Sequence, residues 1–127
     1  MNPSRMELGQ WGEEQAAEFL QDLGYVIVAR NVRTPYGEID LIAQEFPVHA
    51  EGEITTVFIE VKTRSSKKFG FPEEAITPRK QDHIISAAEH YLQEHPELQT
   101  NWRIDVIAIE LYPESIPIIN HFENAFQ

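Results

Sequence analysis

Two short runs of residues, 38–43 and 57–63, constrain this chain most, because each alternates apolar and polar residues as a β-strand does. Both runs carry charged residues among apolar neighbours, namely Glu38, Asp40, Glu60 and Lys62. Side chains two residues apart on a strand project from one face, so the two acids of the first run share a side, as do Glu60 and Lys62. If the two strands pair, three carboxylates and one ammonium group converge.

Such a group of charges needs a counterion. Two like charges about 4 Å apart repel each other by roughly 4 kcal/mol at an effective dielectric constant of about 20, and burial raises the cost further. One lysine cannot neutralise three carboxylates. We therefore expect a divalent cation held by carboxylate oxygens at this place, with Lys62 as the fourth charged partner.

The length and composition predict one domain over residues 1–127. A chain of 127 residues with 42% hydrophobic content suits one core that buries roughly two-thirds of the unfolded surface. No apolar run approaches the length that spans a bilayer, and the first residues lack the apolar core of a signal peptide. The chain has no cysteine, which agrees with a cytoplasmic protein. We expect a cytoplasmic location and no membrane partner.

The net charge of −11 argues against binding to nucleic acid, because affinity for phosphate backbones comes mainly from lysine and arginine. The distribution of charge matters more than its sum. Six of the ten basic residues lie within residues 62–80, with two acids among them. This segment is either a basic lip beside the acidic site or an ordinary solvated run of charges.

The remaining pattern predicts an order of helix, three strands, helix and strand. Gly24 is a natural helix end, and Thr77-Pro78 is a strong helix start. The three strands read as a meander, and the strand around residues 106–109 is apolar on both faces, as a central strand would be. The expected elements are helices over 6–23 and 78–95, strands over 25–33, 38–45, 54–63 and 102–111, and a short edge strand over 116–122.

Four further charged residues need an interpretation: two of them have two possible roles each, and the other two have a structural role. Glu13 lies on the flank of the apolar stripe of the first helix, where it can face the sheet or act as an acid favoured by the helix dipole. Lys80 shares a face with Ile84, so it can point at the acids or extend along apolar surface to water. Arg103 and Asp105 share one face of their strand, and we expect them to form a structural charge pair.

The order of elements, with Asp40 on the second strand and Glu60-Val61-Lys62 on the third, resembles the PD-(D/E)XK nuclease superfamily. Further residues extend the resemblance over nearly the whole chain: Gly9-Gln10-Trp11-Gly12-Glu13, Gly24-Tyr25, Arg30-Asn31, Gly37-Glu38-Ile39-Asp40-Leu41-Ile42-Ala43, Glu60-Val61-Lys62-Thr63-Arg64, Gly70, Lys80, Arg103-Ile104-Asp105-Val106 and Asn124-Ala125-Phe126. This series is similar to the bacterial endonuclease-like YraN family, whose fold is similar to that of archaeal Holliday-junction resolvases.

The resemblance implies an α/β (α+β) fold of restriction-endonuclease type, with an αβββαβ core and a mixed central sheet flanked by helices. It implies that the catalytic residues are Glu13, Asp40, Glu60 and Lys62. Mg²⁺ or Mn²⁺ would be held by Asp40, Glu60, the main-chain carbonyl of Val61 and Glu13, with Glu38 and Lys80 as accessory residues of the site. The chain departs from the family at Gln10 and Trp11, where two arginines are usual, and has Ile39 where the superfamily often has proline.

The resemblance further implies metal-dependent hydrolysis of phosphodiester bonds in DNA, branched or structured DNA included. The nucleic-acid backbone would be held by Arg64, Lys67 and Lys68 with little reading of bases, and the chain would pair as a homodimer. Two other functions remain open on the residues alone. One is a non-catalytic nucleic-acid-binding or adaptor module that retains the nuclease fold. The other is a structural interaction protein in which the acids and lysine form only a buried network of ion pairs.

Overall fold

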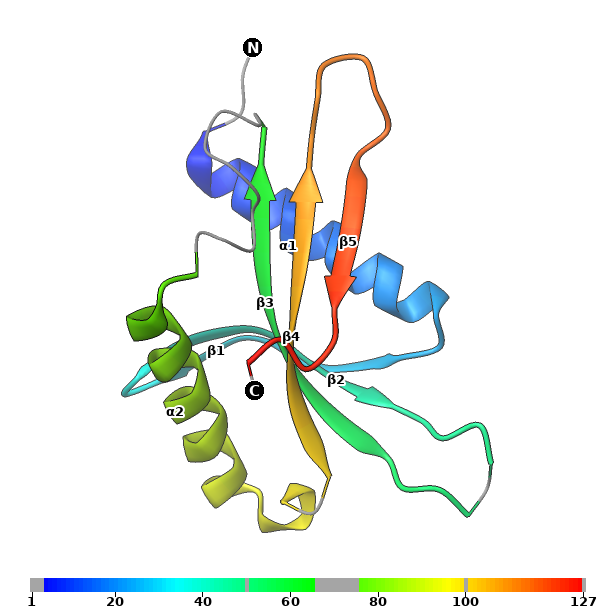
Figure 1. The fold of residues 1–127 in the computed structure, drawn as a ribbon, viewed down its shortest axis with the longest axis vertical. Helices are drawn as coiled ribbons and strands as arrows, with labels where there is room; N and C mark the ends of the chain where they lie inside the picture. Colours follow the sequence, from blue (N-terminus) through cyan, green and yellow to red (C-terminus); the bar gives the residue numbers. More distant parts are fainter. Residues whose placement is uncertain (1–3, 50, 66–75, 100, 127) are drawn as a thin grey trace.

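The computed structural model describes residues 4–49, 51–65, 76–99 and 101–126, and these form two α-helices, five strands and one short 3₁₀ helix. In chain order the elements are α1 (Arg5–Asp22), β1 (Val26–Thr34), β2 (Gly37–Glu45), β3 (Thr55–Arg64), α2 (Pro78–Glu94), η3 (Pro96–Leu98), β4 (Trp102–Glu110) and β5 (Ile118–Phe122) (Figure 1). The predicted αβββαβ order is therefore confirmed, as is the short last strand.

Both long helices begin at a side-chain cap. The hydroxyl of Ser4 accepts a hydrogen bond from the backbone N–H of Glu7 at 3.1 Å, which satisfies one of the free N–H groups at the start of α1. Thr77 does the same for Lys80 at the start of α2, where proline follows at the first helical position as predicted. No helix in the described part of the chain is long and apolar enough to cross a membrane.

The five strands form one mixed sheet in the order β1-β2-β3-β4-β5. The first three strands are antiparallel neighbours, which confirms the predicted meander. Strand β4 pairs parallel to β3 and antiparallel to β5, so it lies inside the sheet. Residues 104–110 of β4 are all buried, as the sequence pattern of a central strand predicts.

The sheet is covered by one helix on each face, and Figure 1 shows α1 behind the sheet and α2 in front of it. Helix α1 packs small residues and Leu20 against one face, with Leu41, Val57 and Ile107 of the strands. Helix α2 packs against the other face, where Phe58 and Val106 contribute to a second core. The alternation of side chains along β3 therefore sends successive residues to different helices.

Candidate metal centre

Asp40 lies where β2 separates from its neighbour β3. Backbone pairing between the two strands stops at Leu41 and Ile59. Beyond that pair, the Oδ2 atom of Asp40 accepts a hydrogen bond from the backbone N–H of Val61 at 2.8 Å. The carboxylate therefore takes the place of a strand carbonyl. Because the N–H and the carbonyl of one strand residue point to the same side, the carbonyl of Val61 also points to the β2 side of β3.

Glu60 lies on β3 next to this position and contacts two lysines. Its Oε1 atom lies 3.4 Å from the Nζ atom of Lys62 and 3.3 Å from the Nζ atom of Lys80. The Glu60 side chain is only 10% exposed, so these charges interact more strongly than they would at an open surface. Lys80 lies in the first turn of α2. Of the two orientations considered for it, the structure has the one in which the side chain points at the acids.

Glu13 reaches the same place from α1 because its neighbour, Gly12, lets the helix come very close to β3. A Cβ atom on Gly12 would overlap the hydroxyl group of Thr63. Glycine is therefore required for this contact between helix and strand. The close approach carries Glu13 to the edge of the sheet, where it lines one cavity with Asp40 and Glu60.

Three of the carboxylates form a tight group. Glu13, Glu38 and Asp40 each offer an oxygen, and these three oxygens lie within 4.8 Å of one another. Glu38 lies on β2, two residues before Asp40, so the two side chains project from the same face of the strand, as predicted. Together with Glu60, these residues make up the acidic cluster, to which α1, β2 and β3 all contribute.

The proximity of the acids changes their ionisation. Burial and the charges of Glu60 and Glu13 raise the pKa of Asp40 to about 8, although its hydrogen bond from Val61 opposes the change. Burial also raises the pKa of Glu13, with further contributions from Glu38 and Glu60. Without a counterion, this arrangement therefore favours protonation near neutral pH. A cation in the acidic cluster would neutralise the charge in place of those protons.

The pKa of Lys62, on β3, changes in the opposite direction. Burial, followed by contact with Lys80, lowers the pKa of Lys62 even though Glu60 attracts its positive charge. Two ammonium groups thus compete for one carboxylate oxygen. Neither lysine forms an ion pair with Glu13 or Glu38 among the described residues, so both ammonium groups lie on the Glu60 side of the acidic cluster. Glu38 instead lies 4.0 Å from the exposed Arg33.

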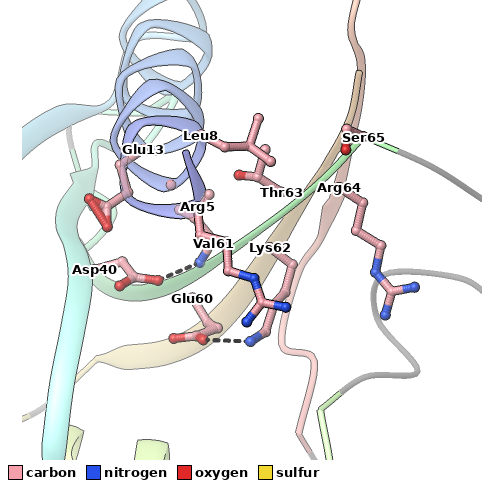
Figure 2. A pocket seen from close by; sticks show the side chains of 11 residues that line it. Arg5, Leu8, Glu13, Asp40, Glu60, Val61, Lys62, Thr63, Arg64 and Ser65 are labelled. Carbon is pink, nitrogen blue, oxygen red and sulfur yellow. Dashed lines mark hydrogen bonds and ion pairs between the residues drawn. The ribbon is translucent and has the colours of Figure 1, made fainter. Parts of the chain in front are cut away.

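The cavity lined by these residues has a volume of about 670 Å³. Figure 2 shows its charges in two groups, with the carboxyl groups of Glu13, Asp40 and Glu60 on one side. The positively charged ends of Lys62, Arg5 and Arg64 lie on the other side. A ligand that carries both a metal cation and a phosphate group would match this division.

The residues predicted as catalytic are brought together, since Glu13, Asp40, Glu60 and Lys62 all line this cavity. Val61 and Arg64 line it too. The two accessory residues, Glu38 and Lys80, line a smaller adjoining cavity of about 280 Å³, to which Asp40 and Glu60 also contribute. Lys67 and Lys68 lie outside the described residues. The catalytic and binding roles themselves stay predictions.

Two residues that lie at this site, Arg5 and Asn31, were not predicted as site residues from the sequence. Arg5, in the first turn of α1, lines the cavity, but nothing in the sequence separates it from any other exposed arginine near a helix start. Asn31, on β1, has a left-handed backbone with φ of 50° and contacts two of the acids. The pair Arg30-Asn31 belongs to the motifs that carry the family resemblance, and this signal could have directed attention to Asn31.

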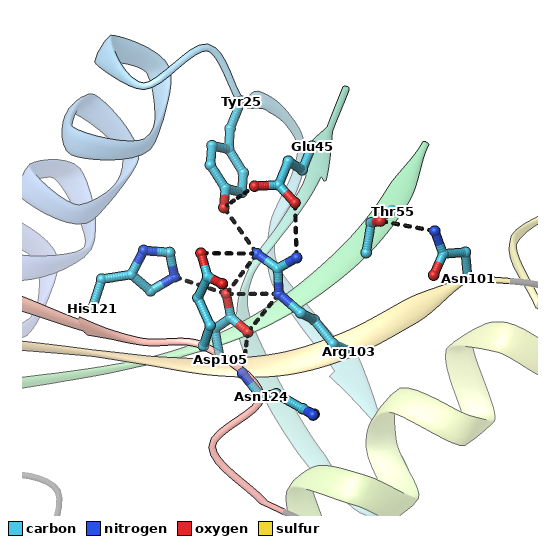
Figure 3. A network of polar contacts seen from close by, with 9 residues as sticks. Tyr25, Glu45, Thr55, Asn101, Arg103, Asp105, His121 and Asn124 are labelled. Carbon is cyan, nitrogen blue, oxygen red and sulfur yellow. Dashed lines mark hydrogen bonds and ion pairs between the residues drawn. The ribbon is translucent and has the colours of Figure 1, made fainter. Parts of the chain in front are cut away.

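A second polar cluster, centred on Asp105, contributes no residue to the cavity (Figure 3). The fully buried Asp105 carboxylate accepts a hydrogen bond from Arg103 Nε at 3.0 Å and lies 2.7 Å from His121 Nε2. The backbone N–H of Asn124 donates to it at 2.9 Å. These contacts lower the pKa of Asp105 despite its burial. The predicted structural charge pair is therefore confirmed, and it connects β4 to β5 and the C-terminal segment.

Comparison with known proteins gives a consistent result. A family model described as "Uncharacterised protein family UPF0102" matches residues 12–109. A UPF0102 protein of Syntrophomonas wolfei is 45% identical over 120 residues, which cover 94% of this chain and 97% of that relative. One from Caldicellulosiruptor saccharolyticus is 44% identical over 124 residues, 97% of this chain and 99% of the relative. One from Geobacter sulfurreducens is 42% identical over 120 residues, 94% of this chain and 88% of the relative.

Proposed function

For a chain that belongs to the uncharacterised protein family UPF0102, we propose the activity of a metal-dependent nuclease of the PD-(D/E)XK type. Its substrate is DNA, including branched or structured DNA, and the reaction is hydrolysis of a phosphodiester bond in the cytoplasm. One observation carries the proposal. A single cavity has three carboxylates on one side and three cationic side chains on the other.

The acidic side fits a divalent cation. Asp40, Glu60, the carbonyl of Val61 and Glu13 would hold Mg²⁺ or Mn²⁺, since both ions prefer oxygen ligands. The raised pKa of Asp40 supports this fit, because it reflects first the burial of the carboxylate and then its closeness to Glu60 and Glu13. When bound, the ion supplies a water of lowered pKa and neutralises charge on the scissile phosphate.

The cationic side fits the phosphate. Lys62 lies 3.4 Å from Glu60, so its ammonium group can reach both the acidic cluster and a phosphate beside it. We assign to Lys62 the orientation of the attacking water and the stabilisation of the extra negative charge in the transition state. Arg5 and Arg64 would hold the phosphate backbone, to which arginine can bind with two parallel hydrogen bonds.

The cation can be tested without a substrate. Isothermal calorimetry should detect binding of Mn²⁺ to the wild type, and the double variant Asp40→Asn/Glu60→Gln should lose it. Glu14→Gln is a matched control, because Glu14 neighbours Glu13 on α1 but pairs with Arg30 at an exposed position. Binding should be unchanged in this control. Unchanged binding in the double variant would remove the metal site from consideration.

The reaction is tested by incubating the protein with branched, single-stranded and duplex DNA in the presence of Mn²⁺. We expect strand cleavage that is lost in the double variant and in Lys62→Met, and retained in Glu14→Gln. We also propose a homodimer, because cleavage of two strands needs two sites, and sedimentation would measure the oligomeric state. Cleavage that persists in the double variant would indicate a contaminating nuclease.

The binding-module alternative rests on the net charge of −11 and the small number of basic residues, because few cationic side chains are available to hold a phosphate in place for cleavage. It predicts binding of DNA without cleavage in the same assay. The structural alternative predicts that Lys62→Met strongly lowers the melting temperature and that Mn²⁺ leaves this temperature unchanged. The three functions therefore give three different outcomes.

A further inference from the structure

Asn31 lies in an unusual backbone conformation directly beside the acidic cluster. Its φ of 50° is in the left-handed region, which asparagine tolerates better than most residues other than glycine. Pairing between β1 and β2 includes Arg30 with Leu41 and Val32 with Ile39. Asn31 therefore faces Asp40 across the two strands.

The side-chain amide of Asn31 joins two acids that come from different elements. Every atom gains a partner when the amide nitrogen, which carries two hydrogens, faces the carboxylates. In that orientation the nitrogen donates to Oε1 of Glu38 at 2.8 Å and to the two carboxylate oxygens of Glu13 at 3.1 and 3.3 Å. The amide thus connects α1 to β2 at the acidic cluster, through Glu13 and Glu38.

The chemistry of the connecting group matters. A lysine at this position would place a positive charge where the cation should bind, as Lys62 and Lys80 already do beside Glu60. An aspartate would add repulsion to three carboxylates whose oxygens already lie within 4.8 Å of one another. A neutral amide can hold two carboxylates near each other while leaving their negative charge available to an ion.

We propose that Asn31 is a positioning residue that fixes the carboxylates of Glu13 and Glu38 for a divalent cation. The inference rests on the proposed function, because it assumes that the acidic cluster binds a cation. It adds a residue outside the predicted ligand set. In known metal sites, groups that hold the ligands in place contribute roughly 10- to 100-fold to metal affinity.

The test compares Asn31→Gly with Asn124→Gly. Asn124 also has a left-handed backbone, with φ of 49°, so both variants make the same chemical change at the same kind of backbone position. We expect Asn31→Gly to weaken Mn²⁺ binding at least about tenfold in calorimetry, and Asn124→Gly to bind as the wild type does. Equal Mn²⁺ affinity in Asn31→Gly and the wild type would overturn the role of Asn31 and leave the proposed function in place. A wild type that binds no Mn²⁺ would overturn the proposed function.

Nuclear magnetic resonance tests the contact without any metal and in a protein that keeps Asn31. The side-chain NH₂ signals of Asn31 should move in Glu38→Ala, which removes one acceptor, and should stay in place in Glu14→Gln. They should move again when Mg²⁺ is added to the wild type, with the midpoint that a calorimetric titration with Mg²⁺ gives. Signals that do not respond to Glu38→Ala would overturn the inference whatever the outcome with metal.

Discussion

Replacing Asp40 by asparagine should stabilise the protein in the absence of metal. The change keeps the size of the side chain and an oxygen that can still accept the hydrogen bond from Val61. It removes a carboxylate whose pKa is raised to about 8 by burial and by the charges of Glu60 and Glu13. A buried cluster of carboxylates holds unfavourable charge, and a variant that lacks one of these charges no longer carries that cost.

The size of this stabilisation and its pH dependence follow from the difference in proton binding between the folded and the unfolded protein. Below about pH 4, Asp40 is protonated in both the folded and the unfolded protein, so it contributes no difference. Between about pH 4 and pH 8, the folded protein holds a proton that the unfolded chain releases, and the stability of the wild type falls as the pH rises. A pKa displaced from 3.8 to about 8 sets an upper bound of about 6 kcal/mol. Solvent on the cavity side screens the carboxylate, so we expect about 2 kcal/mol at pH 8.

Urea denaturation of the wild type and Asp40→Asn at pH 4, 6 and 8 measures this difference, with EDTA present to remove metals. The gain in the free energy of unfolding should be near zero at pH 4 and largest at pH 8, and Glu14→Gln should show no such trend. A variant that is less stable than the wild type at pH 8 would refute the reasoning. Adding Mn²⁺ at about 100 times its Kd should then stabilise the wild type by about 3 kcal/mol and leave Asp40→Asn unchanged.

Three other predictions concern different parts of the molecule. Gly12→Ala should lower the free energy of unfolding by about 1–3 kcal/mol in urea denaturation, because the added methyl group overlaps Thr63; an unchanged stability would contradict the close packing. Asp105→Asn should cost about 3 kcal/mol in the same assay, since it leaves the Arg103 charge without its fully buried partner; a loss below 1 kcal/mol would contradict this. Lys80→Met should tighten Mn²⁺ binding several-fold in calorimetry, because one competitor for the carboxylate of Glu60 is gone, and weaker binding would contradict that role.

Much of the fold can be predicted from the sequence because its signals are local. The cap Thr77 and the proline after it fix the start of α2 through hydrogen bonds and dihedral angles within one turn. The alternation along β3 fixes which residues share a face, since it depends only on the strand geometry. For the same reason, the sequence predicts that Asp40 and Glu60 meet once the two strands pair.

The remaining parts of the acidic cluster depend on packing between distant segments. Gly12 and Thr63 are far apart in the chain, and only the contact of α1 with β3 makes a glycine necessary and carries Glu13 to the cavity. The approach of Lys80 to Glu60 likewise depends on where α2 packs on the sheet. No periodic pattern encodes such distances.

Asn31 illustrates the division most clearly. The sequence by itself determined that acids gather at the junction of two strands, because a period of two places them on one side. Only the tertiary structure decided that the backbone of a third strand turns left-handed there and directs an amide at Glu13 and Glu38. The physical reason is that the sharing of one donor by two carboxylates requires positions in space that three separate elements set together.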